Sequence, residues 1–204
     1  GQVNGLPAWS GNMIAQDRMA GIPASVAILC GPGIQVPLPP AEQRLSDDGR
    51  FGYLGGRVPI GEALADHLGQ GKLRGLSAGS MPTGKVNENA LAVLSRHGVA
   101  VNNPSSKNMD DLEGEQIDMV ITVCDAAAGE ACPVWLGDTP KVHWGLADPA
   151  HATGTEDEIQ AAFEATYSAL NARIKALAEL DLADINPLGL IASAQKIHRD
   201  LGDS

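Results

Sequence analysis

The stretch "SVAILC" at residues 25–30 decides the fold class, because it is a short, almost wholly apolar run that ends in a cysteine. Such a run is typical of a strand buried on both faces of a sheet. A second buried strand of this kind, "IDMVITVC", occupies residues 117–124 and also ends in a cysteine. Shorter strands are predicted by "LRGLSAGS" at 73–80 and "KVHWGL" at 141–146.

Helical patterns separate these strands. "VPIGEALADHLG" at 58–69 has apolar residues at helical spacing, Pro59 at the expected first helical position and a glycine at its end. Strands that alternate with helices predict an α/β fold with a mostly parallel sheet covered on both faces. Further helices are predicted over residues 87–98, over 155–180 with Thr155 as N-cap, and over 186–202.

Two segments lack these patterns. Residues 1–22 show no clear periodicity, and we expect an N-terminal extension. Residues 31–56 combine prolines and glycines with the polar run "AEQRLSDDGR", which predicts a long, atypical loop. The remaining organisation predicts a single domain over residues 23–204, interrupted by that loop.

Composition narrows the class of function. The 204 residues are 44% hydrophobic and carry a net charge of −11, without a Lys/Arg cluster, so we expect no nucleic-acid partner. No apolar run approaches the ~20 residues that span a bilayer, and no signal-peptide pattern is found, so we expect no membrane association. Three cysteines do not suggest a secreted disulfide scaffold, which favours a cytoplasmic protein with functional thiols.

The cysteines are the first candidates for chemistry. Cys30 and Cys124 each end a predicted strand, and ligands of open α/β sheets bind at the carboxyl ends of strands. Cys124 and Cys132 are too widely spaced for an ordinary metal-binding pair, so no metal is expected. A redox pair requires only that the segment between them lets the two sulfurs meet. The alternative is that both are buried structural cysteines.

Two further motifs suggest an anion site. Gly55 and Gly56 free the backbone to turn its N–H groups inward, and Arg57 stands at the start of a helix. Together they predict an anion cradle, although an ordinary loop with a surface arginine is the alternative. Asp148, before Pro149 and after a strand, places a carboxyl group near the other strand ends. It is a candidate general acid, and a simple turn aspartate is the alternative.

Taken together, these segments resemble the thioredoxin-coupled arsenate reductases, which have the low-molecular-weight protein tyrosine phosphatase fold. The blocks that carry the resemblance are "LSAGSMPTGKVNENALAVLSRHG", "IDMVITVCDAAAGEACPVW" and "VHWGLADPA". "RVPIGEALADHLG" is similar to the family's helix opening, with Arg57 and Glu62 in place. The resemblance implies a three-layer sandwich around a central, mostly parallel four-stranded sheet.

The resemblance also implies roles in arsenate reduction. Cys30 matches the thiolate that attacks arsenate, and its pKa is lowered by a helix N-terminus and an arginine. Arg57 matches that arginine, and the N–H groups of Gly55 and Gly56 stand in the anion loop. Asp148 matches the acid that protonates the departing oxygen. The implied substrate is arsenate, with phosphate as the related oxyanion.

Cys124 and Cys132 match the two cysteines that complete the relay. The first attacks the arsenic-linked sulfur, and the second takes over the disulfide and presents it to the reductant. The resemblance implies no bound cofactor and an external protein reductant, thioredoxin or glutaredoxin, in a cytoplasmic arsenical-resistance enzyme.

The loop between nucleophile and arginine departs from the family's Cys-x5-Arg pattern. Here 26 residues separate Cys30 from Arg57. Closing the longer loop costs only about 1.5 kcal/mol more, so the fold is expected to survive, whereas a cradle for one anion demands closer positioning. Two alternatives follow: a catalytically impaired relative that binds an oxyanion or a protein partner, and a low-molecular-weight protein tyrosine phosphatase, whose chemistry needs no cysteine pair.

Overall fold

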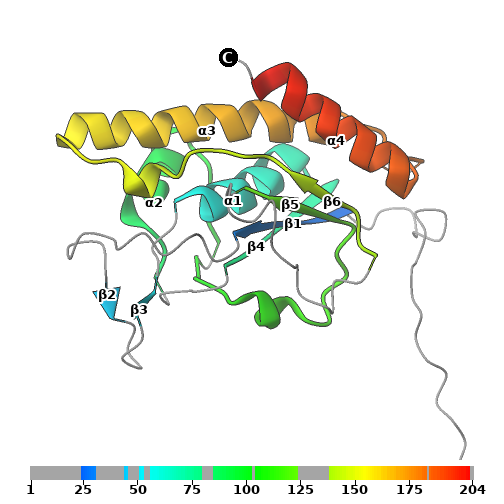
Figure 1. The fold of residues 1–204 in the computed structure, drawn as a ribbon, viewed down its shortest axis with the longest axis horizontal. Coiled ribbons are helices and arrows are strands. Elements are labelled where there is room, and N and C mark those ends of the chain that lie inside the picture. Colours follow the sequence, from blue (N-terminus) through cyan, green and yellow to red (C-terminus); the bar gives the residue numbers. More distant parts are fainter. Residues whose placement is uncertain are drawn as a thin grey trace, which may run out of the picture.

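A parallel four-stranded sheet forms the centre of the molecule in the computed structural model (Figure 1). The structure describes residues 24–30, 44–45, 51–52, 56–79, 85–102, 104–123, 138–182 and 184–202. The strand order is β4-β1-β5-β6, and all three neighbouring pairs are parallel. The predicted α/β class and four-stranded sheet are therefore confirmed. The strands are β1 (Ala24–Cys30), β4 (Leu73–Gly79), β5 (Met119–Thr122) and β6 (Lys141–His143).

The helices begin and end within two or three residues of the predicted ranges. They are α1 (Arg57–Gly69), α2 (Glu88–Arg96), α3 (Glu156–Ala178) and α4 (Pro187–Gly202), with short 3-10 helices η2 (Met109–Leu112) and η5 (Pro149–His151). Thr155 is the N-cap of α3, as predicted, and forms a capping box with Glu158.

The predicted start of α1 at Pro59 is wrong, because the helix begins at Arg57 with Gly56 as N-cap. Pro59 is the third helical residue, where a missing N–H is still tolerated because the first four N–H groups of a helix have no acceptor within it. This shift matters for the site, since it places the arginine in the first turn of the helix.

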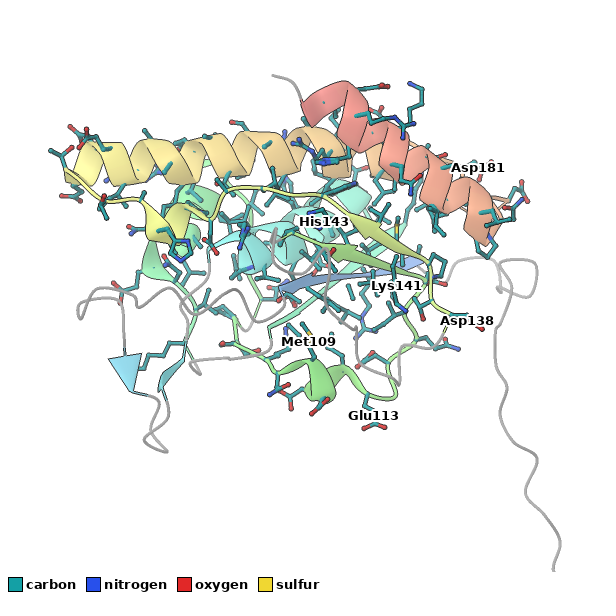
Figure 2. The ribbon with its side chains drawn as sticks, viewed as in Figure 1. Met109, Glu113, Asp138, Lys141, His143 and Asp181 are labelled. Carbon is teal, nitrogen blue, oxygen red and sulfur yellow. The ribbon has the colours of Figure 1, made fainter. Side chains whose placement is uncertain are left out.

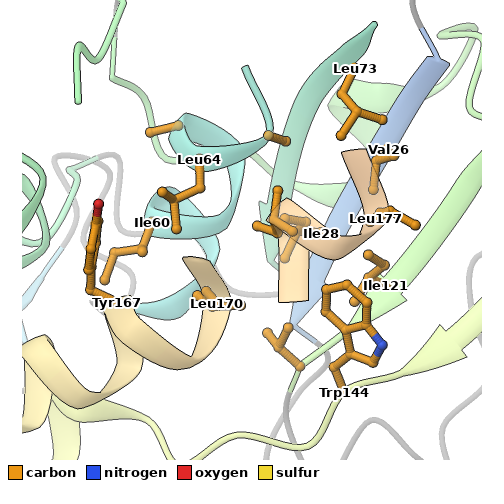
Figure 3. Packing of buried hydrophobic residues seen from close by; sticks show 14 of the residues in the cluster. Val26, Ile28, Ile60, Leu64, Leu73, Ile121, Trp144, Tyr167, Leu170 and Leu177 are labelled. Atoms are coloured by element: carbon orange, nitrogen blue, oxygen red, sulfur yellow. The ribbon is translucent and has the colours of Figure 1, made fainter. Parts of the chain in front are cut away.

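Alternating side chains of β1 divide the core between the two faces of the sheet. Val26 and Ile28 pack on the face covered by α1, α3 and α4, together with the fully buried Trp144 that follows β6 (Figure 3). Ala27 and Leu29 pack on the opposite face. This two-residue alternation is the pattern of a strand buried on both sides.

The second face of the sheet is covered by the segment around η2. Leu112 of η2 is buried against this face, with Met109 packed beside it. Met109 points toward the sheet and Glu113 points away from it (Figure 2). The described residues thus enclose the sheet between the helical layer and this segment, and parallel α/β sheets bind their ligands at the carboxyl ends of the strands.

The predicted loop over residues 31–56 contains a feature that sequence analysis missed. Two short strands, β2 (Arg44–Leu45) and β3 (Phe51–Gly52), form an antiparallel pair in a sheet of their own. Two-residue strands are too short to produce a periodic pattern, although the Asp48–Gly49 pair between them is a turn signal. The predicted N-terminal extension, residues 1–22, lies outside the described residues.

Candidate functional site

Arg57 reaches the carboxyl edge of the sheet from the start of α1. Its residue surface is only 5% exposed. Nη1 donates a hydrogen bond to the carbonyl oxygen of Val123, at 2.9 Å, and another to that of Leu146. Val123 directly follows β5, and Leu146 lies three residues beyond β6. The guanidinium is therefore held where two strands end, and it is not the surface group that a simple loop-to-helix turn would present.

The same edge receives the end of β1. The N–H of Val123 donates to the carbonyl oxygen of Leu29, at 3.2 Å. Leu29 precedes Cys30, the last residue of β1, whose register partner is Gly79. The backbone next to Cys30 and the side chain of Arg57 thus bind the same residue, Val123, although 26 residues separate Cys30 from Arg57 along the chain. The side chain of Cys30 lies outside what the structure describes.

Asp148 forms a buried ion pair with this arginine. Nη2 of Arg57 lies 3.1 Å from Oδ2 of Asp148, and the two side chains are 7% and 2% exposed. The other carboxylate oxygen, Oδ1, accepts hydrogen bonds from the N–H groups of Gly56, at 3.2 Å, and Ala150, at 3.0 Å. Two backbone donors and the ion pair with Arg57 therefore fix the carboxylate of Asp148, which is also the N-cap of η5.

Gly56 allows three segments to meet at this point. A Cβ added to Gly56 would lie 2.7 Å from Cε1 of Phe163 on α3 and 3.0 Å from Cγ of Pro149. A Cβ atom essentially never lies as close as 2.7 Å to another heavy atom, so glycine at position 56 lets the start of α1 approach α3 and the Asp-Pro turn without displacing Phe163. The close approach brings the N–H of Gly56 to Asp148.

A family model for the low molecular weight phosphotyrosine protein phosphatases matches residues 56–186, well over half of the chain. The chain belongs to this family. The matched region begins at Gly56, the N-cap of the helix that carries Arg57, and includes Asp148 and all of α3.

Curated relatives of this phosphatase-family chain include arsenate reductases. The protein of that name from Halalkalibacterium halodurans is 36% identical over 94 residues, which cover 46% of this chain and 67% of the relative. That from Shouchella clausii is 30% identical over 123 residues, covering 60% of this chain and 87% of the relative. A solved structure described as an arsenate reductase in reduced state aligns with a TM-score of 0.53 over 76% of this chain and 95% of its own, at 18% identity, and supports the fold.

Glu62 of the family's helix opening holds α1 against the sheet. Its carboxylate accepts a hydrogen bond from Oγ of Ser77 on β4 and pairs with Nζ of Lys107 at 2.8 Å. One turn further along α1, Oδ1 of Asp66 accepts from the N–H of Gly75 at 2.6 Å. These side-chain bonds fix the position of α1, and with it the position of Arg57.

Helix α4 lies beyond the region that the phosphatase-family model matches. It covers Trp144, whose indole Nε1 donates to the carbonyl oxygen of Ala194 at 3.0 Å. His198 of α4 has a lowered pKa, because burial disfavours its charged form and the positive charges of Arg173 and His143 add to that effect. The surroundings of His198 on α4 therefore favour its neutral form.

The structure brings three of the predicted site residues together, namely Gly56, Arg57 and Asp148. Gly55, Cys124 and Cys132 lie outside the described residues. The carbonyl groups of Val123 and Leu146 were not predicted, because an apolar residue gives no sequence signal for the hydrogen bonds of its backbone.

In the described part of the chain, no group of three His, Cys, Asp or Glu side chains is arranged to hold a metal ion. No helix there is long and apolar enough to cross a membrane.

Proposed function

We propose that this chain is a thiol-dependent arsenate reductase that acts in the cytoplasm. The observation that carries the proposal is the buried Arg57–Asp148 pair at the carboxyl edge of the sheet, which Val123 links by hydrogen bonds to the backbone that leads into Cys30. A guanidinium is well suited to bind a tetrahedral oxyanion, because its planar donors match the oxygen atoms of the anion. The two curated relatives named arsenate reductase support the choice of reaction.

In the proposed reaction, the thiolate of Cys30 attacks the arsenic atom of arsenate. Arg57 and the start of α1 stabilise the negative charge of the oxyanion and favour the thiolate over the thiol. A sulfur–arsenic bond forms, one arsenic–oxygen bond breaks, and the departing oxygen leaves as water after protonation. In this proposal Asp148 delivers that proton, a role supported by the contact between its carboxylate and the guanidinium that would hold the anion.

Reduction requires two electrons, and two thiols supply them. Cys124 attacks the sulfur of Cys30, a disulfide forms between them, and the sulfur–arsenic electron pair stays on arsenic, so that arsenate(V) becomes arsenite(III). Cys132 then exchanges into the disulfide, which frees Cys30, and the Cys124–Cys132 disulfide passes to a thioredoxin-like or glutaredoxin-like reductant. No cofactor needs to remain bound, because the protein's own sulfurs carry the electrons.

The proposal is tested by following arsenate-dependent oxidation of NADPH with thioredoxin and thioredoxin reductase. Turnover should require each of the three cysteines, and Cys30→Ser should abolish it without changing the fold. Mass spectrometry after a single turnover of Cys132→Ser should find a Cys30–Cys124 disulfide. If arsenate is not consumed and all three thiols remain reduced, the proposal is wrong.

Phosphoester hydrolysis is a second candidate, favoured by the phosphatase family to which the chain belongs. A chromogenic aryl phosphate distinguishes the two, because hydrolysis needs Cys30 but neither Cys124 nor Cys132. Activity that survives Cys124→Ser indicates a phosphatase. Binding of phosphate or arsenate in a calorimeter without turnover of either substrate indicates a non-catalytic oxyanion-binding relative, the outcome that the long Cys30–Arg57 separation would explain.

A further inference from the structure

The carboxylate of Asp148 lies beside the place where an oxyanion would meet Arg57. Oδ2 of Asp148 is 3.1 Å from Nη2 of Arg57, and both side chains are almost fully buried. An anion oxygen bound to the same nitrogen would be about 3 Å from it, so it would lie within about 6 Å of Oδ2. At this distance inside a protein, a second negative charge is repelled strongly.

Asp148 is also held so that it cannot simply turn away. Its Oδ1 accepts from the N–H groups of Gly56 and Ala150, which belong to two different segments. Phe163 and Pro149 close around Gly56 and keep these segments together. Oδ2 is therefore the carboxylate oxygen that faces the guanidinium, and a carboxylate oxygen accepts hydrogen bonds.

We propose that Asp148 makes the site selective for oxyanions that carry a proton at neutral pH, such as phosphate and arsenate, over those that carry none, such as sulfate. This inference rests on the proposed function, because it assumes that Arg57 binds the oxyanion. Phosphate and arsenate can donate a hydrogen bond from their own O–H group to Oδ2. Sulfate has no such group, so one of its negatively charged oxygens would face the carboxylate oxygen and be repelled by it. Sites built around such a hydrogen bond reject analogues that lack the group by large factors.

The experiment measures phosphate and sulfate affinities by calorimetry at pH 6, in a Cys30→Ser background so that no thiolate exchanges a proton. We expect phosphate to bind at least tenfold more tightly than sulfate. Asp148→Asn should lower that ratio at least tenfold, because an amide N–H in place of Oδ2 can donate to sulfate. Asp157→Asn, which removes the same charge from an exposed position in the first turn of α3, should leave the ratio unchanged.

A second measurement uses the native aspartate, in case Asp148→Asn does not fold. Repeating the titrations in buffers of different ionisation enthalpy counts the protons taken up with each anion. Binding of sulfate should be accompanied by the uptake of roughly one more proton than binding of phosphate. The reason is that, under the proposal, a proton on Asp148 must replace the one that sulfate lacks. Equal proton uptake for the two anions, or an unchanged affinity ratio in Asp148→Asn, would overturn the selectivity while leaving oxyanion binding in place. Failure of phosphate and arsenate to bind at all would instead remove the proposed function, and the selectivity with it.

Discussion

Gly56→Ala tests whether the contact between α1, α3 and the Asp-Pro turn positions the site. The backbone of Gly56 is in the right-handed helical region, with φ −93° and ψ −28°, so alanine meets no backbone strain. Alanine should in fact gain about 0.4–1 kcal/mol, because it restricts the unfolded chain. Against this, the new Cβ would lie 2.7 Å from Cε1 of Phe163 and 3.0 Å from Cγ of Pro149. Overpacking of this kind costs about 1–3 kcal/mol, and Phe163 is a fully buried ring.

The net expectation is a loss of about 1–2 kcal/mol in the free energy of unfolding, measured by urea denaturation. Oxyanion affinity should fall as well, because the N–H of Gly56 and the carboxylate of Asp148 would be pushed apart. Gly202→Ala is the matched control: its Cβ would come no closer than 3.7 Å to Nη2 of Arg173, an ordinary contact. That variant should unfold within about 0.5 kcal/mol of the parent.

Phe163→Leu provides the decisive comparison. Phe163→Leu should by itself cost about 1–3 kcal/mol, because a smaller side chain leaves space in the core, but that space accommodates the Cβ at position 56. The double variant should therefore be more stable than the sum of the two single changes predicts, by at least about 0.5 kcal/mol. Additive losses, or a Gly56→Ala protein as stable as Gly202→Ala, would refute the claim that Phe163 and Gly56 are in forced contact.

Two further predictions concern the rest of the fold. The lowered pKa of His198, caused first by burial, means that the unfolded imidazole takes up a proton below about pH 6.5 that the folded one resists. Stability should therefore decrease as the pH falls from 7.5 to 5, and urea denaturation of His198→Asn at the two pH values should show a smaller decrease. Gly75→Ala would place a Cβ 2.2 Å from the backbone oxygen of Glu62, which cannot rotate away, so α1 and β4 must separate. We expect a loss of about 3 kcal/mol or more by the same denaturation, and a loss below about 1 kcal/mol would contradict the close packing of α1 on β4.

Most of the fold was predictable because its signals are local. Short apolar runs indicate the buried strands, and the capping box of Thr155 and Glu158 indicates the start of α3. Each of these signals depends on residues a few positions apart, and long-range packing did not override them. The strand pair Arg44–Leu45 and Phe51–Gly52 was missed because two residues are too few to form a pattern.

The candidate site was predictable only in part, because its geometry depends on long-range contacts. Sequence analysis identified Arg57 and Asp148 separately, and for each an ordinary loop or turn role stayed open. No local pattern indicates that the two side chains form an ion pair, since one comes from the start of α1 and the other from the segment after β6. The guanidinium is oriented by the backbone carbonyl groups of Val123 and Leu146. The side chains of these two residues give no sequence signal for those hydrogen bonds.

Stability alone gives a weak reason for a protein to keep such a pair. Burying two charges costs several kcal/mol per ion, and well-packed apolar residues in their place are often neutral or stabilising. Arg57 and Asp148 are nonetheless almost completely buried, and each is held by backbone groups from separate segments. Those contacts fix the orientation of a cation and of a proton acceptor at the carboxyl edge, where α/β folds bind their ligands. The pair is better explained as preorganised chemistry, because a guanidinium and a carboxylate set in place before the substrate arrives need not reorganise during the reaction.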